Sequence, residues 1–458
     1  MATDDHPQLI VWDSPAMPPA EDQRVRQPAA ATSPEDQRVR QLIAAAGQAM
    51  AAGRTFDADG LLRQAENLAP EHPLVLNERA MRRLSAGDFA AAEGLTRQAL
   101  AANPELAAAW LNLATALRGL KRQDEELDAL NRALALEPTN MRALLQSAGL
   151  YEARQDSRTA AATYRKVLML IPPGVQIPME MRSIVDHARR VVDANTQALE
   201  SFLEGHLKAT RAQFAGESAA RFDKSLSTFL GRRRVFRPQP TFLYVPELPA
   251  IEFYDRADFP WLDEIEAASD DIRRELVEVL ADGQAVLEPY IALSATPDEK
   301  WRKLNNSKSW GVFYLWKAGE AQAENMARCP KTVAALANWP KCELPGSAPT
   351  AVFSILEPHT RIPAHTGVNN ARLICHLPLI VPGGCGFRVG ASSREWEPGK
   401  AFVFDDTIEH EAWNDSDDHR AVLIFDIWNP HVSEAERAMV SALTTGVEQF
   451  YGSLPSYL

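Results

Sequence analysis

The sequence predicts a multidomain α+β protein, with an N-terminal α-solenoid and a C-terminal jelly roll, that is, a double-stranded β-helix. Prolines recur every 34 residues, at Pro70, Pro104, Pro138 and Pro172, and a fixed period of this length indicates stacked helix pairs. Beyond residue 240, short segments of alternating polar and apolar residues are separated by turns that contain Gly or Pro, which is typical of β-strands. The length of 458 residues also suits two or three domains.

Residues 37–172 are predicted to form four tetratricopeptide-like units. In the third unit, Trp110, Leu117 and Leu130 fall where such a repeat packs its two helices against each other. Each pair has one apolar face that only a neighbouring pair covers, so about three or more units are needed for stability. Glu126 replaces the usual small residue of the second helix, and we expect looser packing there.

The segments that flank the repeats have different compositions. Residues 1–36 are rich in Pro, Ala, Asp and Gln and are predicted to be a disordered tail. Residues 173–240 are predicted to be a helical linker or cap, and the basic run at 231–240 is interpreted as a solvated linker rather than a polyanion site. Residues 241–458 form the predicted β-domain, with one amphipathic helix near 260–282.

Charge and cysteine content exclude some classes of function. The net charge of -13 and pI near 5.4 argue against broad nucleic-acid binding, which needs a basic face. No apolar run reaches the roughly 18 residues that span a bilayer, so we expect no membrane insertion and a cytoplasmic location. The cysteines lack zinc-ligand spacing and are expected to be inert packing thiols; they are Cys329, Cys342, Cys375 and Cys385.

Two histidines stand at the edges of predicted strands. His365 lies in IPAHTG and His410 in FDDTIEHEAWN. Neutral imidazole is a common ligand of Fe(II), although a single histidine is more often structural. The surrounding motifs favour a metal site.

Several ordered motifs carry a resemblance to a known family. The runs SILEPHTRIPAHTGVNNARLICHLPL, REWEPGKAFVFDDTIEHEAWN and HRAVLIFDIWNP resemble the catalytic domain of aspartyl/asparaginyl β-hydroxylases, over roughly residues 300–435. These enzymes are oxygenases that use Fe(II), O2 and 2-oxoglutarate. Most 2-oxoglutarate oxygenases have a carboxylate ligand two residues after the first histidine, but Gly367 stands there. That glycine is characteristic of this family, which binds iron with two histidines.

The resemblance implies a role for each matching residue. His365 and His410 would bind Fe(II) and be catalytic. Arg420 would grip the distal carboxylate of 2-oxoglutarate, as a planar guanidinium does well. Ser354 would assist Arg420, and His376 would lie near the end of the cosubstrate that chelates the metal.

Three other positions are weaker candidates, and a fourth departs from the family pattern. Trp316 and Arg388 match family positions near the pocket, although either residue can equally be structural. Asp406 is a candidate for orienting the imidazole of His410, or for capping a turn. Some relatives have an arginine where this sequence has Ile374, so weaker binding of 2-oxoglutarate is expected.

The predicted function is hydroxylation of the β-carbon of Asp or Asn in a peptide or protein, with succinate and CO2 as co-products. The repeats would recruit this substrate, because stacked helices offer an extended groove. Three alternatives stay open: a protein-binding adaptor with a non-catalytic jelly roll, an oxygenase of the same class that acts on a small molecule or lipid, and a metal-dependent cupin enzyme that needs no 2-oxoglutarate. The sequence leaves the physiological substrate and the oligomeric state open.

Overall fold

A computed structural model describes residues 33–172, 174–281, 287–293 and 298–452. The chain divides after Leu226 into two compact units, which are described separately. Most of the predicted N-terminal tail lies outside the described residues, but its last part is helical, because a helix begins at Pro34 with Ser33 as its cap. Among the described residues, no helix has the length and apolar character to cross a membrane.

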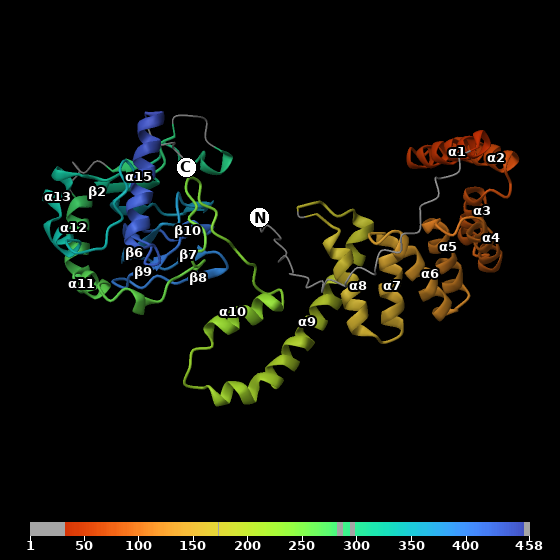
Figure 1. Cartoon of the computed structure of the whole chain (residues 1–458), viewed down its shortest axis with the longest axis horizontal. Helices are drawn as coiled ribbons and strands as arrows, with labels where there is room; N and C mark the ends of the chain where they lie inside the picture. The colour runs from red at the N-terminus through yellow and green to blue at the C-terminus, as the bar shows by residue number, and fades with distance from the viewer. Residues whose placement is uncertain (1–32, 173, 282–286, 294–297, 453–458) are drawn as a thin grey trace. The chain divides into compact units, whose positions relative to one another are not determined.

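The first unit contains four successive helical hairpins (Figure 1). Several helix starts are specified by the sequence: the first and third helices have a proline in the first turn, and Asp88 and Asn140 cap the fourth and seventh helices with their side chains. The predicted α-solenoid is thereby confirmed. The helices are α1 (Pro34–Ala51), α2 (Thr55–Leu68), α3 (Pro73–Ser85), α4 (Phe89–Ala102), α5 (Ala107–Gly119), α6 (Gln123–Leu136), α7 (Met141–Ala153) and α8 (Ser157–Met169).

The expected looseness at Glu126 is absent, because the side chain has a partner. Glu126 is buried and its carboxylate accepts a hydrogen bond from Nε2 of Gln146 on α7, at 2.8 Å. Burial raises the pKa of this carboxyl. A buried polar group with a hydrogen-bond partner is tolerated in a core, so the repeat accommodates the unusual residue.

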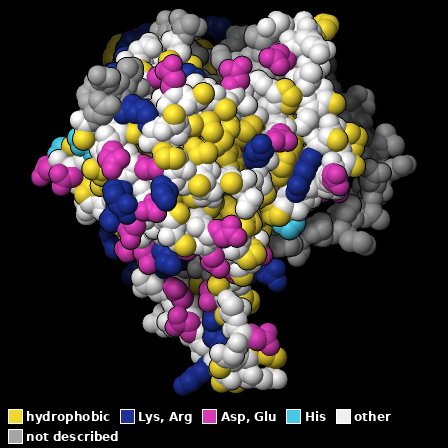
Figure 2. Space-filling view, turned by 90° about the vertical axis from the view of Figure 1, so that its left-hand side faces the viewer, with side chains coloured by type: hydrophobic (Ala, Val, Ile, Leu, Met, Phe, Trp, Pro, Cys, Tyr) yellow, Lys and Arg dark blue, Asp and Glu magenta, His cyan; other side chains and the backbone are white. Residues whose placement is uncertain are grey.

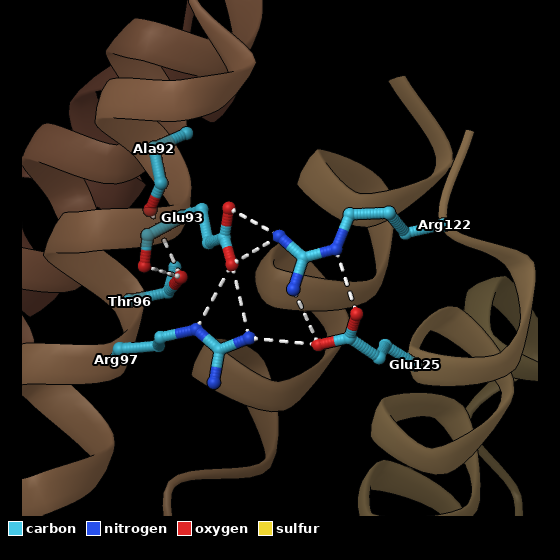
Figure 3. A network of polar contacts seen from close by, with 6 residues as sticks. All are labelled: Ala92, Glu93, Thr96, Arg97, Arg122 and Glu125. Carbon is cyan, nitrogen blue, oxygen red and sulfur yellow. Dashed lines mark hydrogen bonds and ion pairs between the residues drawn. The ribbon is translucent and has the colours of Figure 1, made fainter. Parts of the chain in front are cut away.

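A network of charges joins the second and third repeats on their exposed side (Figure 3). Nη1 of Arg122 lies 2.8 Å from Glu93, and Nη2 of Arg97 lies 3.1 Å from Glu125. The charges alternate in sign, but the pairs are largely solvated, and such pairs contribute little individually.

Two further helices follow the repeats, α9 (Met179–Gln213) and α10 (Ala220–Phe229). Ala188 on α9 is buried in one apolar cluster with Tyr164 of the last repeat helix, α8. The first part of α9 therefore covers the end of the repeat array, as expected for a cap.

The second unit is built on two antiparallel sheets, which confirms the predicted α+β class and jelly roll. The larger sheet has the order β1-β2-β4-β11-β6-β9, with β3 beside β2, and the smaller has the order β5-β10-β7-β8. The strands are β1 (Glu288–Pro289), β2 (Trp310–Lys317), β3 (Glu320–Ala321), β4 (Ala351–Leu356), β5 (Thr360–His365), β6 (Arg372–Ile380), β7 (Cys385–Val389), β8 (Ser392–Arg394), β9 (Phe402–Phe404), β10 (His410–Asn414) and β11 (Arg420–Trp428).

Helices cover the outer face of the larger sheet. The single helix predicted near 260–282 is two helices, because α11 ends at Ala267, with Ala268 as its C-cap, and α12 begins at Ser269. Their apolar side chains share one core with the outward-facing residues of β4, β6 and β11. The helices are α11 (Leu262–Ala267), α12 (Ser269–Ala281), α13 (Ala323–Arg328), α14 (Pro330–Ala335) and α15 (Glu434–Tyr451), with short 3-10 turns at Arg256–Asp258 and Glu299–Trp301.

The prediction of a solvated linker at 231–240 is wrong for Arg233. Its guanidinium pairs with Glu252 and donates hydrogen bonds to the hydroxyl of Ser392 and the carbonyl of Ala391. Further along, the N–H of Thr241 donates to the carbonyl of Gly367 at 3.0 Å. The segment is therefore fixed to the jelly roll, because its polar groups find partners there.

One face of the molecule carries a cluster of hydrophobic side chains with charged side chains around it (Figure 2). A separate observation is that Val277 and Leu280 on α12 are exposed, at 49% and 36%. Single exposed apolar residues such as these two are common on protein surfaces.

Candidate active site

A cavity of about 120 Å³ lies between the two sheets. The inward residues of the larger sheet meet the smaller sheet there, because side chains alternate between the two faces of a strand. The side chains that carry its chemistry are Tyr290, Trp310, Ser354, His365, Arg372, His376, Asp406, His410, Arg420 and Asp426. Most of its other walls are apolar, including Ile362, Phe387 and Phe404.

The sheet pairing brings His365 and His410 together. The two residues are paired across β5 and β10, and their ring centroids lie 4.1 Å apart. Nδ1 of His365 donates to the carbonyl of Pro363 at 2.8 Å, and Nδ1 of His410 donates to that of Ile408 at 3.1 Å. These bonds leave Nε2 of each ring available as a metal ligand.

Both imidazoles are held neutral. Burial lowers the pKa of His365 to about 3, with a further contribution from His410. Burial also lowers the pKa of His410 to about 4. A neutral imidazole offers a lone pair to a metal, so both rings are ready to bind one near neutral pH.

Gly367 provides space for the carboxylate of Asp406. A Cβ atom at position 367 would overlap that carboxylate, and the N–H of Gly367 donates to the carbonyl of Asp406 at 2.7 Å. A side chain at the position where most related oxygenases have a carboxylate ligand is therefore excluded by packing.

The sequence offered the carboxylate of Asp406 as a candidate for orienting His410, but this carboxylate has no hydrogen bond to that ring among the described residues. The Asp406 carboxylate contacts Gly367 and lies 3.5 Å from Nη2 of Arg372. The main-chain carbonyl of Ile408 holds the His410 ring instead.

Arg420, His376 and Ser354 lie on neighbouring strands of the larger sheet. Arg420 is 2% exposed, and burial lowers its pKa to about 10. Nε of Arg420 and Nδ1 of His376 have no hydrogen-bond partner among the described residues. Trp396 contacts both side chains, since its ring lies 5.1 Å from the guanidinium and is stacked on the imidazole. Ser354 accepts a hydrogen bond from Nε1 of Trp310 at 3.0 Å.

A second buried arginine of the cavity has acidic partners. Nη1 of Arg372 lies 3.4 Å from Asp426, and Nη2 lies 3.5 Å from Asp406. Asp426 also accepts a hydrogen bond from the N–H of Thr350 at 3.0 Å. Burial raises the pKa of Asp426 to about 7, although Arg372 lowers it in part.

The structure places Trp316 outside the cavity. A bulge between Tyr314 and Trp316 shifts the register of β2, so that Trp316 pairs with Ala351. It therefore shares the outer face of the sheet, where it packs edge-to-face on Trp339 at 5.0 Å. Trp310 is the tryptophan of this strand that lines the cavity.

Arg388 is also absent from the cavity walls among the described residues. Its neighbour Phe387 lines the cavity, and consecutive residues of a strand point to opposite faces. Arg388 pairs with Glu411 and lies 2.9 Å from Glu409. Of the two roles that the sequence allowed for Arg388, near the pocket or structural, the contacts agree with the structural one.

Sequence reasoning missed Arg372 and Asp426 as site residues, although the strand period contains the signal. Arg372, Ile374 and His376 alternate along β6 and all line the cavity. Asp426 stands six residues after Arg420 on β11, and so on the same face. Extending each strand pattern from its first identified residue would have found both.

The cavity fits the metal and cosubstrate that the resemblance implies. Two neutral imidazoles have free Nε2 atoms, and two histidines with open positions suit Fe(II). Arg420 is a buried cation without an ion-pair partner in the part of the chain that the structure describes, which is costly unless an anion binds. A dicarboxylate with one end on the metal and the other on Arg420 would meet both requirements.

Fold and site together define a jelly-roll protein with a two-histidine centre and an anion pocket. Residues 266–430 match the family model described as Aspartyl/Asparaginyl beta-hydroxylase. Residues 266–430 of the C-terminal unit are therefore similar to this hydroxylase family, which confirms the resemblance.

Curated relatives agree with this assignment. The chain is 39% identical over 185 residues to the "Ornithine lipid ester-linked acyl 2-hydroxylase" of Rhizobium tropici, which covers 40% of this chain and 62% of that protein. It is 34% identical over 164 residues to the human "Aspartyl/asparaginyl beta-hydroxylase", which covers 35% of this chain and 21% of that protein. The chain thus spans less than two thirds of either relative.

The repeat region also aligns with solved structures. One is a thermophilic TPR protein of Thermus thermophilus, at 20% identity and a TM-score of 0.27, covering 42% of this chain and 94% of that one. The assignment of the repeats therefore rests on the order and pairing of helices α1 to α8.

Proposed function

We propose that the chain is an Fe(II)- and 2-oxoglutarate-dependent dioxygenase that hydroxylates a carbon atom of its substrate. The observation that carries the proposal is one cavity that holds both the His365–His410 pair and the buried guanidinium of Arg420, which has no ion pair among the described residues. In the overall reaction a C–H bond, O2 and 2-oxoglutarate give C–OH, succinate and CO2. One oxygen atom enters the hydroxyl group and the other enters succinate.

The bound iron would supply the oxidising chemistry, and the chain would bind and orient its partners. His365 and His410 would hold the metal through Nε2. Arg420 would pair with the distal carboxylate, and Ser354 and His376 would fix the rest of the cosubstrate. The apolar walls exclude water, which strengthens these electrostatic contacts.

Ile374 supports the expectation of weaker cosubstrate binding. It lines the cavity between Arg372 and His376 on β6 and offers no charge. Arg372 is engaged by two carboxylates, so it does not replace the arginine that some relatives have. Arg420 would then be the main anchor for the cosubstrate.

The proposed acceptor is the β-carbon of an Asp or Asn residue in a peptide or protein. The family description and the presence of a helical-repeat array, which is suited to binding extended peptides, support this class. A second candidate is a lipid or a small molecule, because the Rhizobium tropici relative is named for acyl hydroxylation.

Succinate formation from 2-oxoglutarate tests the proposal. The full chain, purified anaerobically, is given Fe(II) and then air. We expect wild type to form succinate, and His410→Ala and Arg420→Ala to lose about 100-fold or more, the equivalent of about 2.7 kcal/mol. His359→Ala and Arg361→Ala are matched controls, because both side chains are more than half exposed.

The opposite result favours a different class. A wild-type chain that binds neither Fe(II) nor 2-oxoglutarate would support the non-catalytic adaptor. A wild-type chain that binds Fe(II) but neither binds nor converts 2-oxoglutarate would support a metal-dependent enzyme without this cosubstrate, and succinate formation that survives Arg420→Ala would contradict the role of Arg420.

A further inference from the structure

The cluster formed by Arg372, Asp406 and Asp426 leaves no positive charge for a substrate. One guanidinium faces two carboxylates, at 3.4 and 3.5 Å. All three side chains are at least 88% buried, with side-chain exposures of 12%, 9% and 0%. An acidic substrate group beside them would meet like charges in a medium of low dielectric constant.

The same cluster has unused hydrogen-bonding capacity. Nε of Arg372, Oδ1 of Asp406 and Oδ1 of Asp426 are buried and have no partner among the described residues. Buried polar atoms rarely stay unpaired. The cluster thus offers one donor and two acceptors to whatever enters the cavity.

A primary carboxamide has the complementary set, because it carries one carbonyl acceptor and two N–H donors. A carboxylate carries acceptors only and matches one of the three atoms. Ile374, next to Arg372 on the cavity face of β6, adds no compensating cation.

The charge balance of the cavity also favours an uncharged carboxamide over a carboxylate in the substrate. A metal dication on two neutral imidazoles is balanced by dianionic 2-oxoglutarate. The cation of Arg420 balances the one net negative charge that the cluster carries when both of its carboxyls are ionised, which for Asp426 means above about pH 7. A further carboxylate would leave a net charge buried, which is costly. A carboxamide adds none.

We propose that the Arg372–Asp406–Asp426 cluster selects a substrate residue that carries an uncharged carboxamide, so that the site takes Asn in preference to Asp. This inference rests on the proposed function. The cluster makes Arg372 a specificity-determining residue rather than an anchor for an acidic substrate.

Two peptide pools test this preference. They have the same randomised flanking positions and differ only in a central Asn or Asp. Binding is measured by equilibrium dialysis and mass spectrometry, with the full chain loaded with 2-oxoglutarate and Zn(II), which is redox-inert and prevents turnover. We expect the Asn pool to bind about tenfold tighter or more. Equal binding, tighter binding of Asp, or binding of neither pool would overturn the proposal.

Variants assign the preference to the cluster. Asp426→Asn removes one of the two carboxylates that pair with Arg372, so its guanidinium can pair with an acidic substrate. The preference for the Asn pool over the Asp pool should then fall to below about threefold. The matched control Glu411→Gln, which alters a pair with Arg388 outside the cavity walls, should leave it unchanged. Ile374→Lys adds a cation to the same face and should shift binding toward Asp even if Asp426→Asn fails to fold. An unchanged ratio in a folded variant would contradict the assignment.

Succinate formation without peptide, measured on the same preparations with Fe(II), separates the two proposals. Its absence would remove the proposed function itself. Its presence together with a preference for Asp would remove only the role of the cluster.

Discussion

Arg420 and Arg372 are both buried in one cavity, yet their surroundings differ. Arg420 has an aromatic neighbour and no ion pair among the described residues, and burial lowers its pKa to about 10. Arg372 lies between two carboxylates, which raise its pKa. A buried cation without a partner is a binding site for an anion, whereas one that is already paired holds the fold together and shapes specificity.

Substitution of the paired arginine, Arg372, is expected to have the largest effect on stability. Arg372→Gln leaves two carboxylates buried without their cation, so we expect the chain to lose about 3–5 kcal/mol of unfolding free energy. Urea unfolding followed by tryptophan fluorescence measures this in the second unit, because every tryptophan except Trp12 and Trp110 lies beyond residue 260. A loss below about 1 kcal/mol would show that the pairs are weak.

The next effect concerns the glycine that accommodates Asp406. Gly367→Ala would place a Cβ atom against the Asp406 carboxylate, and we expect overpacking to cost about 1–3 kcal/mol and to disturb the nearby pair with Arg372. Gly383→Ala is the matched control, since a Cβ there meets nothing within 4 Å. Equal stability of the two variants by urea unfolding would show that the carboxylate moves aside freely.

The buried carboxyl of Asp426 is expected to make the stability of the second unit depend on pH, with a smaller effect than the two substitutions above. The folded-state pKa of Asp426 is raised to about 7, mainly by burial, above an unfolded value of about 3.9. Its contribution to stability is therefore fully present below the unfolded pKa and is lost as pH rises through the folded value.

Asp426→Asn removes this titration. Between about pH 5 and about pH 8, the Tm of wild type should fall by a few degrees relative to that of the variant. Thermal unfolding followed by fluorescence measures the difference, and a constant difference across this range would contradict the raised pKa.

The smallest effect is expected where charged pairs are exposed. Glu93→Gln or Arg122→Gln breaks the network between repeats (Figure 3). We expect the unfolding free energy of the repeats to fall by at most about 1 kcal/mol, and by less at high salt. Circular dichroism of helix unfolding at low and high salt measures it. A loss above about 2 kcal/mol, or one that salt leaves unchanged, would mean that these surface pairs behave like the buried ones.

Local patterns predicted much of the fold. The prolines at a spacing of 34 residues located the repeats, and alternation located the strands that carry His365 and Arg420. Trp316 could not be placed from its sequence, because a bulge in β2 moves it to the opposite face of the sheet. Arg233 was missed for a similar reason, since its partners Glu252 and Ser392 lie far along the chain.

Calorimetric titration of 2-oxoglutarate into the anaerobic, Fe(II)-loaded chain tests directly whether Arg420 anchors the cosubstrate. Wild type is compared with Arg420→Gln and with Arg372→Lys, which keeps the charge of the paired residue. We predict that Arg420→Gln weakens binding about 100-fold and that Arg372→Lys changes it by less than about threefold. Equal losses in both variants, or unchanged binding in Arg420→Gln, would contradict the assignment of Arg420 as the anchor of the cosubstrate.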